Sequence, residues 1–163
     1  NQIVKIIEFD SVKPGKHDIQ WDGKTESGEL CEKDVYIYVM KARNGNRIFT
    51  YNPSATGNKE LDIEDIKYNE QDMSIEYVLP QAAWVCTRLG LKKSVFFKTL
   101  VDWEPQEAGR HILKWNGWDK EGVIMFAKDP RLAVSVSAYS LPANSVIIKS
   151  SKKPVYLTLF SSI

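Results

Sequence analysis

One sequence motif occurs twice in this chain, and the two copies lie 94 residues apart. The first copy runs from Gly15 to Gly28 and the second from Gly109 to Gly122. Both read G-[KR]-H-x-[IL]-x-W-[DN]-G-x-x-x-x-G, with five identical and three similar residues in fourteen positions. Agreement over this length, without a gap, indicates a duplicated structural unit.

The sequence on either side of the motif is duplicated as well. Short β-type runs precede the copies at residues 3–7 and 96–100. Further β-type runs follow at residues 35–39 and 132–136, where the second copy carries about four extra residues. Each preceding run is separated from its glycine by a polar segment that contains a proline. Short apolar runs between polar turns predict strands.

The motif itself has a physical interpretation as a strand that ends in a tight loop. Alternation places His17, Ile19 and Trp21 on one face of the strand. The dipeptides Asp22-Gly23 and Asn116-Gly117 tolerate the positive φ angles of turns. Repeated short strands with turn signals between them predict an all-β chain with a β-sandwich architecture.

The composition excludes several functional classes. Hydrophobic residues make up 43% and charged residues 26% of the 163 residues, which is typical of a globular protein of one ordinary or two small domains. A formal net charge of +1 with scattered Lys and Arg argues against nucleic acid or a membrane surface as partner. No run reaches the ~18 apolar residues that a membrane span needs. With two His and two Cys, most catalytic and zinc templates are hard to build, so we expect no enzyme, metal or cofactor.

A family resemblance rests on the second copy and its flanks. Residues 74–80 read SIEYVLP, 83–88 read AWVCTR, 97–100 read FKTL, and 108–122 carry the repeated motif. These segments resemble the successive strands of the Ig-like domain found in flagellar hook-capping proteins (the FlgD-type Ig-like domain) and in many secreted and surface bacterial proteins. The first copy matches the same pattern from Val4 to Ala42 but has no counterpart of the Leu-Pro strand or of the strand after it. Both copies also lack the glycine that precedes the Tyr strand in the family.

The resemblance implies two tandem β-sandwich modules of the Ig-like or fibronectin-like kind. We expect an incomplete first module at residues 1–50, a connector at 51–72 and a second FlgD-like module at 73–149. A β-prone tail then follows at residues 150–163. The resemblance covers about three quarters of the chain and implies an extracytoplasmic bacterial protein; it says almost nothing about activity.

The tail suggests how the first module could be completed. Residues 155–160, VYLTLF, form an uncharged β-prone run that would favour aggregation if it stayed unpaired. We therefore expect Val155, Tyr156, Leu157, Leu159 and Phe160 to take part in β-augmentation. The strand could complete the first module of its own chain or that of a neighbouring copy. The rival is that residues upstream of this sequence supply the missing strand.

Two functions from different classes follow. The first is a structural or assembly subunit that binds protein partners, with self-association included, because an incomplete sandwich exposes an edge and part of its core. The second is a carbohydrate-binding accessory module that uses Trp103 and Trp118 as stacking platforms. These two tryptophans are expected to flank turns, and local packing is the alternative for both. Cys31 and Cys86 are either bridged or buried thiols.

Overall fold

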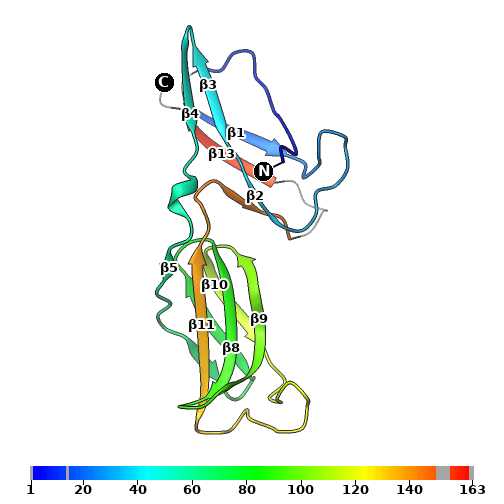
Figure 1. Ribbon diagram of the computed structural model, residues 1–163, viewed down its shortest axis with the longest axis vertical. Coiled ribbons are helices and arrows are strands. Elements are labelled where there is room, and N and C mark those ends of the chain that lie inside the picture. Colours follow the sequence, from blue (N-terminus) through cyan, green and yellow to red (C-terminus); the bar gives the residue numbers. More distant parts are fainter. Residues whose placement is uncertain (1, 14, 150–154, 162–163) are drawn as a thin grey trace. The chain divides into compact units, whose positions relative to one another are not determined.

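The computed structural model describes residues 2–13, 15–149 and 155–161 (Figure 1). In these residues the regular structure consists of strands, with one short 3₁₀ turn, η1 (Ser54–Thr56). The all-β class expected from the sequence is confirmed. No described helix is long and apolar enough to cross a membrane.

The chain divides into two compact units, and one of them is discontinuous. Unit 1 consists of residues 1–36 and 146–163, and unit 2 of residues 37–145. Unit 2 is therefore inserted into unit 1. The sequence analysis expected a first module at 1–50, which the C-terminal strand could complete, and a second module at 73–149.

Unit 2 is built around two antiparallel sheets (Figure 1). The first has the order β10-β7-β6 and the second has the order β5-β11-β8-β9. The strands are β5 (Glu60–Leu61), β6 (Lys67–Asn69), β7 (Ser74–Leu79), β8 (Ala83–Leu91), β9 (Phe96–Gln106), β10 (Gly109–Lys114) and β11 (Leu132–Ser140).

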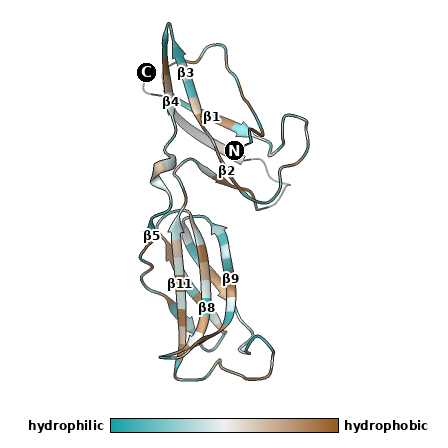
Figure 2. Ribbon diagram, viewed as in Figure 1, coloured by the Kyte–Doolittle hydropathy of each residue, from teal (hydrophilic) through white to brown (hydrophobic). Residues whose placement is uncertain are grey.

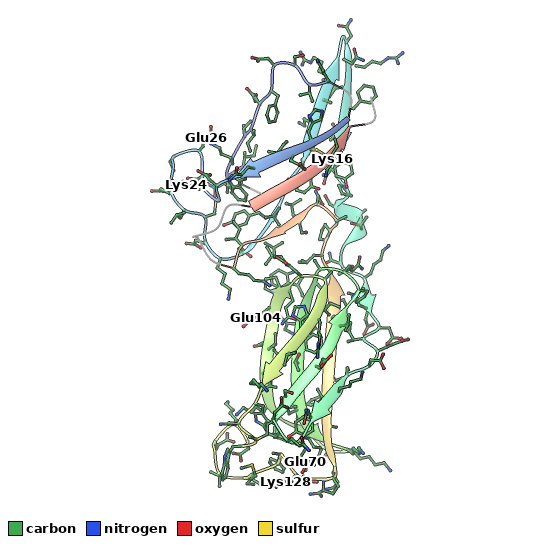
Figure 3. The ribbon with its side chains drawn as sticks, turned by 180° about the vertical axis from the view of Figure 1, so that it is seen from behind. Lys16, Lys24, Glu26, Glu70, Glu104 and Lys128 are labelled. Carbon is green, nitrogen blue, oxygen red and sulfur yellow. The ribbon has the colours of Figure 1, made fainter. Side chains whose placement is uncertain are left out.

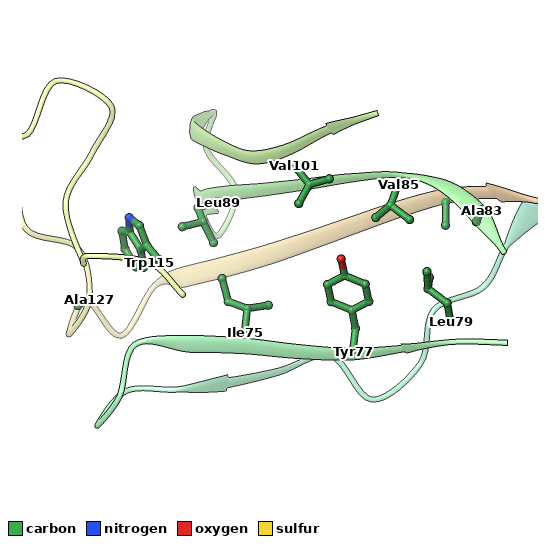
Figure 4. Packing of buried hydrophobic residues seen from close by; sticks show 10 residues of the cluster. Ile75, Tyr77, Leu79, Ala83, Val85, Leu89, Val101, Trp115 and Ala127 are labelled. Atoms are coloured by element: carbon green, nitrogen blue, oxygen red, sulfur yellow. The ribbon is translucent and has the colours of Figure 1, made fainter. Parts of the chain in front are cut away.

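The core of unit 2 lies between these sheets (Figure 4). Alternate residues of β7 and β8 point inward, as the period-2 pattern of a half-buried strand requires. Apolar residues recur along β8 and β11 in Figure 2. The buried cluster comprises Ile75, Tyr77, Leu79, Ala83, Val85, Leu89, Val101, Trp115, Ala127 and Ala138. Trp115 closes one end of it, where its ring lies 6.2 Å from that of Phe97.

The stretch at 51–72, which the sequence analysis expected to be a connector, contains two short strands. It contributes β5, which pairs with β11, and β6, which pairs with β7. The physical reason is that four apolar side chains in this stretch, Leu61, Ile63, Ile66 and Tyr68, pack against the core. The acidic residues between these apolar residues are typical of a solvated linker, which is why the sequence predicts a connector here.

Two shorter pairings complete the fold. A hairpin joins β3 (Met40–Asn44) to β4 (Arg47–Tyr51). Its turn contains Gly45 at φ 58°, as a two-residue hairpin favours. Strand β2 (Val35–Ile37) pairs with β12 (Ser145–Ile147).

Unit 1 has one longer ladder. Strand β1 (Gly15–Trp21) pairs antiparallel with β13 (Val155–Ser161) along its whole length. In the described part of this unit the buried apolar side chains are Trp21, Cys31, Val146 and Ile148.

The duplication is visible at the level of single hydrogen bonds. Trp21 Nε1 donates to the Lys24 carbonyl at 2.8 Å, and Trp115 Nε1 donates to the Trp118 carbonyl at 2.7 Å. The two histidines also match, since each ring Nε2 lies 2.7–2.8 Å from the carbonyl oxygen four residues earlier.

Candidate interaction site

The loop after β10 contains Trp118, one of the two tryptophans expected to flank turns, and hydrogen bonds fix its backbone. The Trp118 backbone N–H donates to Asn116 Oδ1, and its carbonyl accepts from Trp115 Nε1 and from Lys98 Nζ. The side chain of Trp118 is about one-third exposed (36%). Asp119 is buried and accepts the Val123 N–H at 2.7 Å, so this carboxylate caps the turn.

The tip of the same loop is apolar and exposed. Val123, Ile124 and Met125 are 72%, 52% and 48% exposed, and Met125 forms a backbone bridge with Trp118. The sequence analysis did not single out these residues, although three consecutive apolar residues after a turn glycine are a signal for an exposed tip. The loop therefore presents a small apolar surface on a fixed backbone.

Trp103 lies within β9 and not beside a turn, which corrects the sequence expectation. Its strand bulges here, because Thr87 pairs with Val101 while Val85 pairs with Glu104. Trp103 has φ 49°, which is unusual for a bulky residue. A bulge re-aims side chains, and the Trp103 ring lies 5.6 Å from the ring of Tyr139 on β11.

Trp103 and Trp118 do not form one platform. Trp118 is held through Lys98 near the start of β9, and Trp103 follows Lys98 by five residues of the same strand, or roughly 15 Å. The partner of Trp103 is Tyr139, which the sequence did not indicate because the two residues are 36 positions apart.

The tail residues singled out from the sequence lie in β13. Val155, Tyr156, Leu157, Leu159 and Phe160 are opposite Trp21, Gln20, Ile19, His17 and Lys16 of β1. The strand partner that the structure shows for the tail is therefore in the same chain.

The N-terminal segment, residues 2–13, exposes apolar side chains in unit 1. Its five exposed members are Ile3, Ile6, Ile7, Phe9 and Val12, each more than 40% exposed. The segment forms no strand, and contacts with the loop after β1 hold it: the Glu26 N–H donates to the Val4 carbonyl at 2.8 Å, and Lys5 pairs with the Glu26 carboxylate. Figure 3 shows Lys24 and Glu26 on this loop. The sequence predicted a strand at residues 3–7 and missed this exposed surface.

The candidate metal and redox residues have ordinary structural partners. Cys31 and Cys86 are both free and buried, and burial raises the pKa of the Cys31 thiol. His17 and His111 each contact a backbone carbonyl, as described above. No group of three or more His, Cys, Asp or Glu with metal-binding geometry occurs among the described residues.

No family model, curated protein or solved structure matches this chain.

Proposed function

We propose that the chain is a non-catalytic assembly subunit that binds a protein partner through unit 1. In this proposal both units are Ig-like sandwiches of the FlgD type, and the protein works in an extracytoplasmic complex of a bacterium. The observation that carries the proposal is the contrast between the units. Unit 2 buries a cluster of ten side chains, whereas the N-terminal segment of unit 1 leaves five apolar side chains in water.

Exposed apolar surface of this kind supports binding over catalysis. Scattered apolar residues are normal on a protein surface, but a contiguous run marks an interaction site. The segment is also attached, through Lys5, Val4 and Glu26, and is not left as a free tail. A pre-organised apolar strip lowers the entropic cost of binding a partner.

The test is site-specific photo-crosslinking in the cells that make the protein. A photo-reactive phenylalanine analogue replaces Phe9, which is 57% exposed, or Val95 of unit 2, which is 78% exposed and serves as control. We expect a discrete protein adduct from position 9 that is absent from position 95. Equal labelling at both positions, or no adduct at position 9, would contradict the proposal.

A second candidate function, carbohydrate binding, is favoured by the Trp103–Tyr139 pair. Both rings are about 40% exposed on the outer face of the β5-β11-β8-β9 sheet. Exposed aromatic faces can stack on sugar rings. This function predicts a glycan-array signal that Trp103→Ala abolishes and that Phe9→Ala leaves intact.

A further inference from the structure

One end of unit 2 is formed by three connections between its strands. They are the β6–β7 turn at residues 70–73, the β8–β9 turn at 92–95 and the β10–β11 connection at 115–131. Antiparallel pairing brings them together, because the end of β8 is opposite the start of β11 and the end of β10 is opposite the start of β7. Figure 3 shows Glu70 and Lys128 at this end. The three connections form the loop end of unit 2.

The two longer connections of the loop end contact each other at their base. Lys98, three residues after the β8–β9 turn, donates from Nζ to the Trp118 carbonyl at 3.3 Å. The neighbouring ring of Phe97 stacks on that of Phe126, with centroids 4.3 Å apart. The two connections therefore present one surface on a fixed backbone.

This surface carries exposed apolar side chains on both connections. Val123, Ile124 and Met125 are consecutive, and Trp118 forms a backbone bridge with Met125. Single exposed apolar residues are ordinary on a protein surface, but a group of them on adjacent loops marks an interaction site. The six members, each at least 36% exposed, are Val95, Phe96, Trp118, Val123, Ile124 and Met125.

Lysines surround the apolar group. The β8–β9 turn and the start of β9 supply Lys92, Lys93 and Lys98 and no acidic residue, and the β10–β11 connection adds Lys120 and Lys128. All but Lys98 are exposed, and these four take part in none of the ion pairs found in the described part of the chain. Their charges are therefore available to a partner.

The carboxylates of the loop end neutralise little of this positive charge. Asp119 is buried and caps its own turn, and Asp129 pairs with Arg131 at 2.8 Å. Glu70 and Glu121 remain as carboxylates of these connections without an ion pair among the described residues. Over the whole chain the formal charge is only +1, so the excess of cations is a property of this end and is hidden in the composition.

The residue types favour a lipid surface over a protein as the occupant. Protein interfaces are enriched in Arg and depleted in Lys. Here the free cations are lysines, and the arginine of the β10–β11 connection is already paired. Segments that bind bilayer surfaces place apolar side chains at the acyl boundary, Trp at the level of the headgroups and Lys beside the lipid phosphates. The loop end has all three kinds of side chain.

We propose that the loop end of unit 2 binds the surface of an anionic lipid bilayer. Val95 and residues 123–125 enter the acyl boundary, Trp118 lies at the headgroups, and the lysines contact lipid phosphates. This binding goes beyond the assembly function proposed above, uses unit 2 alone and does not depend on that function.

The test is flotation of the full chain with lipid vesicles. Phosphatidylcholine vesicles that contain about one-third phosphatidylglycerol are compared with pure phosphatidylcholine vesicles. A lysine beside an anionic surface strengthens binding roughly fivefold, and salt screens this attraction. We therefore expect binding to the anionic vesicles that is at least about tenfold stronger than to the neutral ones and that falls with added salt.

Charged substitutions at the apolar tips locate the inserted surface. Val95→Asp and Ile124→Asp each place a carboxylate at the acyl boundary and are expected to weaken binding at least about tenfold, because the charge must lose its water. Ile48→Asp changes an exposed isoleucine on β4 and is expected to bind as the native chain does. An unchanged melting curve shows that each variant is folded.

A matched pair of variants separates local charge from net charge. Lys92→Gln with Lys93→Gln is expected to weaken binding to anionic vesicles at least about tenfold. Lys24→Gln with Lys33→Gln removes the same charge from the loop after β1, where both lysines are exposed, and is expected to have little effect.

Tryptophan fluorescence reports the depth of the surface. Bromine atoms on the lipid acyl chains quench tryptophans that approach the chains. We expect quenching of the native chain, most of it lost in Trp118→Phe and kept in Trp103→Phe, because Trp103 lies farther along β9.

The outcomes distinguish this inference from the proposed function. Absence of binding to anionic vesicles, equal binding to neutral ones, or native-like binding by both aspartate variants overturns the inference. A discrete protein adduct from the phenylalanine analogue at position 95 also overturns it, since a protein would then cover the loop end. The crosslink at position 9 tests the assembly function by itself, so either proposal can fail while the other holds.

Discussion

Truncation of the buried tryptophan of unit 2 tests whether the repeated motif forms the end of its core. Trp115 is 5% exposed, and its ring lies 6.3 Å from Tyr68 and 6.2 Å from Phe97. Its indole N–H also fixes the following loop through the Trp118 carbonyl. Trp115→Ala therefore removes a large packed surface and one loop contact together.

The expected cost can be worked from burial. A tryptophan buries about 200 Å² of mostly apolar surface, which at about 25 cal/mol per Å² corresponds to about 5 kcal/mol. The alanine methyl group retains roughly 1 kcal/mol of this. The Trp118 carbonyl keeps Lys98 Nζ as a donor at 3.3 Å, so the lost hydrogen bond adds little. We expect a loss of about 4 kcal/mol, within the range of about 3–5 kcal/mol measured for such truncations.

The matched variant is Trp21→Ala in unit 1. Trp21 is equally buried and makes the same indole contact, but the ring contact described for it is with Tyr36 alone, and a hollow lies beside it. We expect a loss of about 2 kcal/mol, because water can enter the space that the ring leaves. Urea unfolding followed by circular dichroism gives both values, with each unit fitted as its own transition. A loss below about 1 kcal/mol for Trp115→Ala would refute the assignment of the repeat to the core.

Three further predictions concern other parts of the chain. Gly117→Ala is expected to destabilise the protein strongly, because the new Cβ would meet sulfur and carbon atoms at 2.7–3.1 Å. The Cβ of Gly122→Ala meets nothing within 4 Å, so this variant should cost only the backbone strain of its φ of 72°, about 1–2 kcal/mol. Thermal unfolding that ranks the two variants in the opposite order would contradict this. Deletion of residues 152–163 removes the strand partner of β1 and should lower the melting temperature of unit 1, so an unchanged melting curve would count against the pairing. Hydrogen bonds from Arg131 hold the pKa of Asp129 at about 2. The contribution of these hydrogen bonds to stability is therefore present above about pH 4 and is lost as the pH falls towards 2. An NMR titration should show that Arg131→Ala moves the pKa of Asp129 back towards 3.8, and an unshifted curve would exclude the contact.

The repeat made the class of the fold predictable. Alternation around Trp21 and Trp115 indicates strands, and both tryptophans are buried. Their loops close through the same indole-to-carbonyl hydrogen bond, which the repeated spacing accommodates in both copies but did not itself predict. These are local properties, and period-2 burial and turn chemistry determine them.

The arrangement of strands could not be predicted in the same way, because it depends on contacts between distant residues. The short strands β5 and β6 contain few residues and many charges, and their burial follows from neighbours on β11 and β7. The ring contact between Trp103 and Tyr139 depends on a bulge, a positive φ and a partner on another strand. None of these three features can be recognised from the neighbouring sequence. The apolar N-terminal segment has the sequence of a strand, yet a strand forms only where a neighbour offers hydrogen bonds.

The insertion of unit 2 into unit 1 has a consequence for synthesis. The residues that pair between β1 and β13 are 134–146 positions apart in the chain. At about 5–20 residues per second, the ribosome makes β13 roughly 7–30 s after β1. All residues of unit 2 are synthesised within that interval, so unit 2 can fold. The edge of β1 stays unpaired until β13 has been made. The nascent chain is thus most exposed to capture by chaperones or by other strands just when unit 2 is already native.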